Sequence, residues 1–228
     1  MSNYHITKTM NTFSITGVYK AGWALCKKYL TFFITSSVIY FVFFIIINYI
    51  ADKGTIWSAF LSIVSTALSI MFSIGMIKNA FAIYAGQAPS SAHFKTDFRT
   101  ILRIFWASII VMFFSAIGLI LLIIPGIIVM LRLSLTSYVV IDKGMTGWQS
   151  VKESWILTRG HSWNILGFLL LALVISTIAM IPVGLGLIIA VPWIILSSTG
   201  VYIDIRNRVK QSVSSVVTPL PMVEEKVV

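Results

Sequence analysis

Long apolar runs alternate with short polar segments along most of the chain. A helix needs about 20 apolar residues to cross the hydrocarbon core of a bilayer, and most of these runs reach that length. The chain is therefore predicted to be an all-α polytopic membrane protein. Six membrane-spanning helices are expected, at residues 30–50, 56–77, 104–124, 127–141, 163–181 and 187–205.

The connections after the first, third and fifth spans are very short, whereas those after the second and fourth are longer and charged. This spacing predicts three antiparallel hairpins. We expect an N-terminal cytoplasmic segment at residues 1–29, a six-span membrane domain at 30–205 and a cytoplasmic tail without ordered structure at 206–228.

A segment with some amphipathic character precedes each hairpin, and we expect these segments to lie in the head-group layer as interfacial helices. The middle one is broken by Pro89 and is less regular. Trp23-Ala-Leu-Cys-Lys27 is similar to Trp155-Ile-Leu-Thr-Arg159, which is a weak sign of threefold repetition. The apolar stripes are Tyr19, Gly22, Trp23, Cys26 and Leu30 before the first hairpin and Trp148, Val151, Trp155 and Thr158 before the third.

Composition and charge agree with a membrane protein. The chain is 58% hydrophobic and only 11% charged, against about 25% charged residues in a typical soluble domain. Fifteen of the 17 basic residues fall on one side of the predicted spans, and Lys53 and Arg132 are the exceptions. The positive-inside rule therefore predicts that both termini are cytoplasmic. The net charge of +10 suits anionic lipid head groups better than nucleic acid, because it is spread among short loops.

Pro125 and Gly126 interrupt the apolar region between residues 104 and 141. Either the chain turns at this pair, or it turns near Gly118 and Pro125 kinks the fourth helix. A break of this kind has a structural explanation, because freed backbone groups can be satisfied inside a helix bundle. It also has a functional one, because a helix N-terminus can face an anionic ligand.

Arg132 is the one basic residue inside a predicted span. A guanidinium there is costly unless it snorkels to the head groups, contacts backbone carbonyls or binds an anion. Its planar fork suits phosphate. Our candidate ligand site is therefore Arg132 together with Pro125 and Gly126.

The sequence offers no candidate catalytic centre or metal site. The three histidines fall outside the predicted spans, and the seven acids lie in loops, in the tail or at the end of the last span. Ion-coupled transporters usually need acids within their spans. We therefore predict a protein that is not an enzyme and that needs no cofactor. The single cysteine, Cys26, is expected to be a small apolar residue rather than a lipidation site.

The region from LLIIPGIIVMLRLSL (121–135) through an Asp-Lys-Gly turn (142–144) to SWILTRG (154–160) has a recognisable pattern. It resembles the membrane domain of the glycerophosphoryl diester phosphodiesterase superfamily and the uncharacterised YciC-type bacterial inner-membrane proteins. The resemblance covers about residues 118–167. It implies the membrane module alone, because the soluble catalytic barrel of those phosphodiesterases has no counterpart in this sequence.

Within this motif the expected roles are structural. Trp155 anchors at the interface, Arg159 meets lipid phosphates, and Gly160 ends the helix before the fifth span. Two functions remain open for a bacterial inner-membrane protein of this kind. One is binding or moving a lipid or phosphate-bearing amphiphile through Arg132. The other is a scaffold, assembly factor or envelope-integrity protein that acts on membrane-protein partners through residues 146–160 and the tail.

Overall fold

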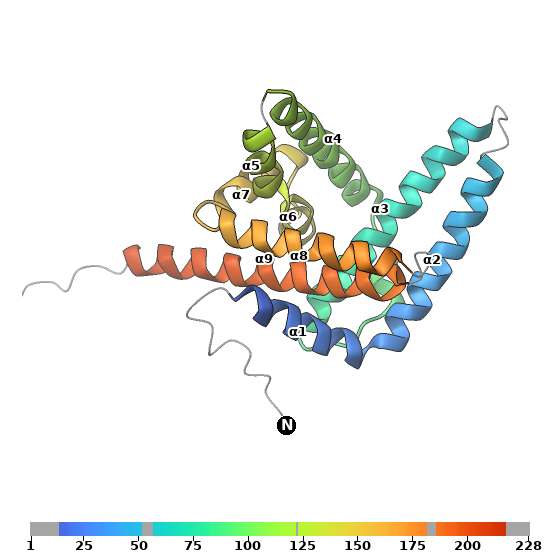
Figure 1. Ribbon diagram of the computed structural model, residues 1–228, viewed down its shortest axis with the longest axis horizontal. Coiled ribbons are helices and arrows are strands. Elements are labelled where there is room, and N and C mark those ends of the chain that lie inside the picture. The colour runs from blue at the N-terminus through green and yellow to red at the C-terminus, as the bar shows by residue number, and fades with distance from the viewer. Residues whose placement is uncertain (1–13, 52–56, 122, 182–185, 218–228) are drawn as a thin grey trace, which may run out of the picture.

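The computed structural model describes residues 14–51, 57–121, 123–181 and 186–217, and all regular structure in these residues is helical (Figure 1). The all-α prediction is therefore confirmed. The elements are α1 (Ile15–Lys28), α2 (Leu30–Ala51), α3 (Trp57–Tyr84), η2 (Ser91–Phe94), α4 (Phe98–Leu121), α5 (Ile123–Leu133), α6 (Thr136–Lys143), α7 (Gly147–Leu157), α8 (Ser162–Met180) and α9 (Leu187–Val217).

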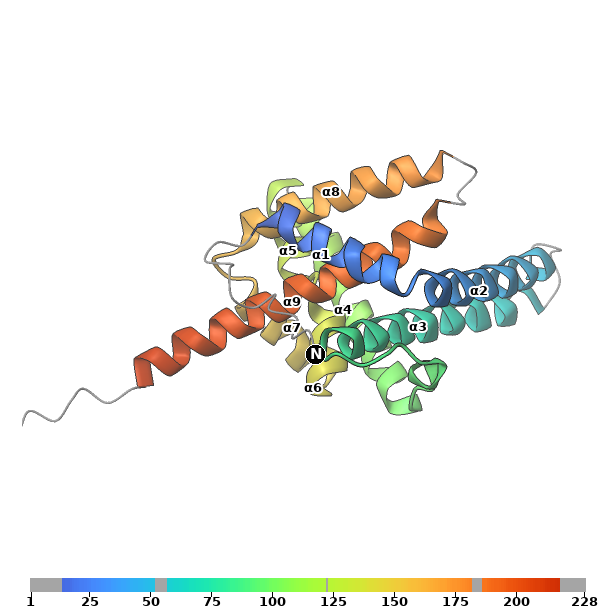
Figure 2. The same cartoon turned by 90° about the horizontal axis from the view of Figure 1, so that it is seen from below.

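Five of the described helices are long and apolar enough to cross a membrane, namely α2, α3, α4, α8 and α9. They correspond to the first, second, third, fifth and sixth predicted spans. Three antiparallel hairpins are present, α2–α3, α4–α5 and α8–α9 (Figures 1 and 2). The described residues therefore have the architecture of a polytopic helical membrane protein.

The fourth predicted span is divided into α5 and α6, which have 11 and 8 residues. Neither reaches the roughly 20 residues that cross a bilayer. The break follows from two hydroxyl side chains. Ser134 Oγ donates to the carbonyl of Leu131 at 2.8 Å, and Thr136 Oγ1 donates to that of Leu133 at 2.7 Å. Short polar side chains that bond to nearby backbone compete with continued helix.

The turn between α4 and α5 lies at neither of the two positions that we considered. Helix α4 ends at Leu121 and α5 begins at Ile123, so Pro125 is the third residue of α5. The first four N–H groups of a helix have no acceptor within it, so a proline costs little there. Gly118 lies against Gly126, since a Cβ on Gly118 would be 2.9 Å from the Gly126 Cα. The two glycines let the arms of this hairpin approach closely.

Polar side chains join the arms of the first hairpin. Asn48 Nδ2 donates to Ser65 Oγ at 3.0 Å, and the hydroxyls of Tyr40 and Ser69 are also 3.0 Å apart. Hydrogen bonds between helices help to hold helices together where lipid provides no hydrophobic driving force.

Each segment that precedes a hairpin packs mainly against another hairpin. The segment before the second hairpin, η2, packs on α3 of the first. The segment before the third, α7, packs on α4 of the second, and α1 packs on α9 of the third. Figures 1 and 2 both show α1 beside α9. These three contacts form a closed ring that joins all three hairpins, which fits the predicted threefold theme.

Helix α1 has the predicted amphipathic face, but that face covers protein. Tyr19, Gly22 and Cys26 are buried, whereas Lys20 and Lys27 are exposed. A Cβ on Gly22 would lie 2.3 Å from Ser197 Oγ of α9, so the two helices cross in close contact. The indole N–H of Trp193 donates to the carbonyl of Tyr19 at 3.0 Å. The apolar face of helix α1 therefore packs on the helical body.

The last helix continues to Val217, so the expectation of an unstructured tail from residue 206 is wrong for residues 206–217. Two ion pairs stabilise this extension. Arg206 bonds to Asp142 of α6 at 2.8 Å, and Arg208 bonds to Asp204 one turn earlier, also at 2.8 Å. Residues 218–228 of the predicted tail lie outside the described residues.

Candidate functional site

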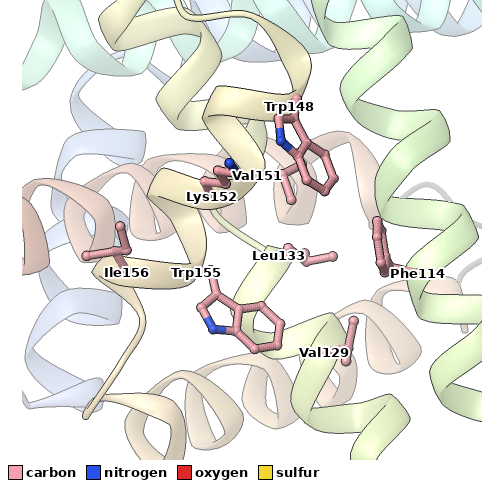
Figure 3. Close-up of a pocket in the computed structure, with 8 residues that line it drawn as sticks. All are labelled: Phe114, Val129, Leu133, Trp148, Val151, Lys152, Trp155 and Ile156. Atoms are coloured by element: carbon pink, nitrogen blue, oxygen red, sulfur yellow. The ribbon is translucent and has the colours of Figure 1, made fainter.

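An apolar groove of about 390 Å³ lies between α4, α5 and α7 (Figure 3). Trp148 and Trp155 stand two turns apart on the same side of α7, and Figure 3 shows Leu133 between them with Phe114 opposite. Only one of the eight lining side chains carries a charge. The lining residues are Phe114, Val129, Leu133, Trp148, Val151, Lys152, Trp155 and Ile156.

The start of α7 is fixed against the middle of α4. A Cβ on Gly147 would lie 2.9 Å from the backbone nitrogen of Ala107, so only a glycine permits this approach. The side chain of Gln149 accepts a hydrogen bond from the backbone N–H of Thr146, a feature of helix N-termini. This placement brings Trp148 against Phe114, with ring centroids 6.0 Å apart. The groove is thus built by helix packing and not by a loop.

Arg132 does not itself line the groove, but its side chain contacts one of the lining residues. Its guanidinium carbon is 4.6 Å from the centre of the Trp155 ring, a distance typical of a cation–π contact. Its Nε is buried without a hydrogen-bond partner, and no acid of the described residues pairs with it. Arg132 also occupies the last turn of α5, where the helix dipole favours a positive charge.

The backbone of Arg132 is held by α7. Its carbonyl accepts hydrogen bonds from Ser154 Oγ at 2.7 Å and from Thr158 Oγ1 at 3.3 Å. These hydroxyls satisfy a carbonyl that the end of α5 leaves without an intrahelical partner. Arg132, from the first part of the sequence motif, therefore meets Ser154 and Thr158 from the second part.

Pro125 and Gly126 are not brought to Arg132. They lie in the first turn of α5, whereas Arg132 is six residues beyond Gly126, about 9 Å along the helix axis. Gly126 is buried against α4. The expected head-group site at this broken helix is therefore not formed with Arg132, and Trp155 takes the place that we assigned to the glycine and proline.

The remaining motif residues occupy structural positions. Thr158 is fully buried, and its hydroxyl donates hydrogen bonds to backbone carbonyls of α5 and α7. Gly160 has a φ of +87° in the turn that follows α7, a conformation that favours glycine. Arg159 is exposed. Trp23 packs on Trp193 of α9 with ring centroids 4.9 Å apart and lies far along the chain from the groove.

Lys152 was not singled out from the sequence as a site residue, although it lines the groove. Its ammonium lies 5.5 Å from the centre of the Trp148 ring. The contact between Lys152 and Trp148 could have been predicted from their four-residue spacing, because residues four apart are neighbours on a helix. The contributions of Phe114 and Val129 come from other helices and left no signal in local sequence.

Other candidate chemistry is weak in the described residues. No group of three or more His, Cys, Asp or Glu side chains within them is placed to hold a metal ion. Cys26 is fully buried, and burial raises the pKa of its thiol to about 11. A thiol of this kind is inert at neutral pH, which favours its structural role over lipidation.

Comparison with models of known protein families, with curated proteins and with solved structures finds no match for this chain. The resemblance to the membrane domain of the phosphodiesterase superfamily therefore stays a prediction from the sequence motif.

Proposed function

We propose that this protein is a non-enzymatic, multi-pass protein of a bacterial cytoplasmic membrane that binds or helps to move a lipid or phosphate-bearing amphiphile. The observation that carries this proposal is the unpaired guanidinium of Arg132 stacked on a wall of the apolar groove. An apolar site with a few placed polar groups is the usual form of a small-molecule site. The apolar part of the ligand would lie in the groove and the phosphate on Arg132.

Native mass spectrometry of the gently purified protein tests this proposal. Wild type is compared with Arg132→Leu and the co-purifying lipids are identified. We expect wild type to retain a discrete phosphate-bearing lipid that the variant loses. Arg99→Leu is the matched control, because Arg99 is an exposed arginine that does not line the groove. The same broad lipid mixture on all three proteins would refute the proposal.

The second candidate function is a scaffold or assembly factor for other membrane proteins. The observation that favours it is the exposed surface of α7, where Trp148 and Trp155 are 48% and 40% exposed. A change at Trp155 cannot separate the two functions, because this residue also holds Arg132. Deleting residues 211–228 can, since none of the lining residues of the groove belongs to this segment. Loss of a partner complex with unchanged lipid retention would favour the scaffold.

The location in the bacterial inner membrane and the cytoplasmic position of both termini belong to this proposal. The distribution of basic residues supports them. Both termini lie on one side only if α5 and α6 together make the return crossing, because five long helices alone would place the termini on opposite sides. Alternating fusions to alkaline phosphatase and to a fluorescent protein would test the orientation. We expect a fusion at position 53 to report a location outside the cytoplasm. A cytoplasmic signal at that position would reverse the proposed orientation.

A further inference from the structure

The size of the groove restricts the ligand more tightly than the proposed function does. Small-molecule sites typically enclose about 300–1,000 Å³, and this groove, at about 390 Å³, lies near the lower end of that range. We propose that it holds one hydrocarbon chain, and that the ligand is a single-chain amphiphile ending in a phosphate monoester. This inference rests on the proposed function and specifies its ligand.

The aromatic walls of the groove are each held in place by neighbouring side chains. Trp148 is held between the ring of Phe114, at 6.0 Å, and the ammonium of Lys152, at 5.5 Å. Trp155 is held by the guanidinium of Arg132 at 4.6 Å. Each indole ring is therefore held in position by a neighbouring side chain. The floor is closed by Leu133 and Val151, which are both buried.

The charges around the groove favour a phosphate monoester over a monoanionic head group. Two cations contact its walls, Arg132 on Trp155 and Lys152 on Trp148. No ion pair of the described residues includes either of them. A phosphate monoester carries a charge of about −1.5 to −2 at pH 7, which two cations can neutralise. A carboxylate or a phosphodiester carries only one.

Lys152 and Trp155 are three residues apart and so are neighbours on the surface of α7. The Lys152 side chain now reaches back to Trp148, and rotation of its stem would turn the ammonium toward the Arg132 end of the groove. Both cations would then meet the same phosphate, while the chain of the ligand lies over Leu133.

The test is a competition measured by native mass spectrometry on the delipidated full-length protein in mild detergent. Five probes are offered: oleoyl lysophosphatidic acid, farnesyl phosphate, dioleoyl phosphatidic acid, oleic acid and inorganic phosphate. We expect retention of the single-chain phosphates at least about tenfold above the two-chain lipid and the fatty acid, as expected for one or two charge-assisted hydrogen bonds. Inorganic phosphate alone should not bind. The relative retention of oleoyl lysophosphatidic acid and farnesyl phosphate shows whether the ligand is a glycerolipid or an isoprenoid.

Three variants connect the binding to the groove. Arg132→Gln should lower retention of the single-chain phosphates about tenfold or more, and Val129→Trp should abolish it by filling the groove. Phe114→Ala removes one wall and should admit the two-chain lipid, so a gain of binding accompanies the losses. Arg99→Gln and Ile45→Trp are the controls and should bind as wild type does, since Arg99 is an exposed arginine of α4 that does not line the groove and Ile45 is 62% exposed on α2.

The outcomes separate this inference from the proposed function. Equal retention of the one-chain and two-chain phosphates, with loss in Arg132→Gln, would overturn the single-chain assignment and leave the proposed function standing. Retention of oleic acid at the level of the phosphates would overturn the phosphate assignment. If every probe binds, and Arg132→Gln does not change that binding, both this inference and the proposed function are overturned.

Discussion

The close crossing of α1 and α9 makes Gly22→Leu an informative perturbation. A Cβ at position 22 would lie 2.3 Å from Ser197 Oγ and 3.1 Å from the Ser197 backbone nitrogen. The hydroxyl could rotate away, but the backbone of α9 cannot, so a leucine would have to move α1 outward.

The expected size of the effect follows from the cost of overpacking. Forcing a larger side chain into a packed contact typically costs about 1–3 kcal/mol. Applied to the docking of α1 alone, this range raises the population of the undocked helix about 5- to 150-fold.

Cys26 provides the assay, because it is the one cysteine of the chain and lies fully buried in α1. A maleimide can react with it only when α1 leaves α9. If undocking is fast relative to labelling, the labelling rate is proportional to the undocked population. Gly22→Leu should therefore accelerate labelling of the folded protein about 5- to 150-fold.

Lys20→Leu is the matched control, since Lys20 is exposed on the opposite side of the same helix. Its labelling rate should equal that of wild type. An unchanged rate in Gly22→Leu would refute the close crossing as the contact that holds α1. Equal acceleration in both variants would show that labelling reports added hydrophobicity and not undocking.

Three further predictions concern other contacts. Burial raises the pKa of Cys26 to about 11, so its contribution to stability is complete below its ordinary pKa near 8.5 and is lost as pH rises through 11; Cys26→Ala should show a shallower alkaline loss of stability in detergent melts. Asn79→Ala removes a fully buried side chain whose carbonyl oxygen accepts from Ser90 and His93; it should destabilise that loop by about 1–3 kcal/mol, seen as faster hydrogen exchange at residues 86–97, and exchange equal to wild type would contradict it. Gly118→Val meets backbone at 2.9 Å and should lower the free energy of unfolding by about 1–3 kcal/mol, whereas a stabilised variant would argue against this helix contact.

The positions of the long helices could be predicted from the sequence because hydrocarbon thickness sets their length. The first span, expected at residues 30–50, is α2 at Leu30–Ala51. The same argument failed for the tail, because the apolar run ends near residue 205 while the helix continues to Val217. Its extension depends on Arg206 and its bond to Asp142, a residue 64 positions earlier.

The candidate site could be predicted only in part for a similar reason. Arg132 stood out from the sequence, because a charge in an apolar run is conspicuous. Trp155 was singled out only as an interfacial anchor, because its contact with Arg132 is a tertiary one. The carbonyl of Arg132 at the end of α5 likewise accepts from two hydroxyls that lie 22 and 26 residues away, those of Ser154 and Thr158. Local patterns do not contain such distant partners.

The ring of contacts also constrains how the protein can be made. Helix α1 leaves the ribosome long before α9, because its partner Trp193 follows 174 residues after Tyr19. During synthesis the buried face of α1 must therefore wait, on the membrane surface or on a chaperone, until the third hairpin has been inserted. A chain that stalls before that point would display an unpaired amphipathic helix at its N-terminus, a signal by which quality control could distinguish unfinished copies from complete ones.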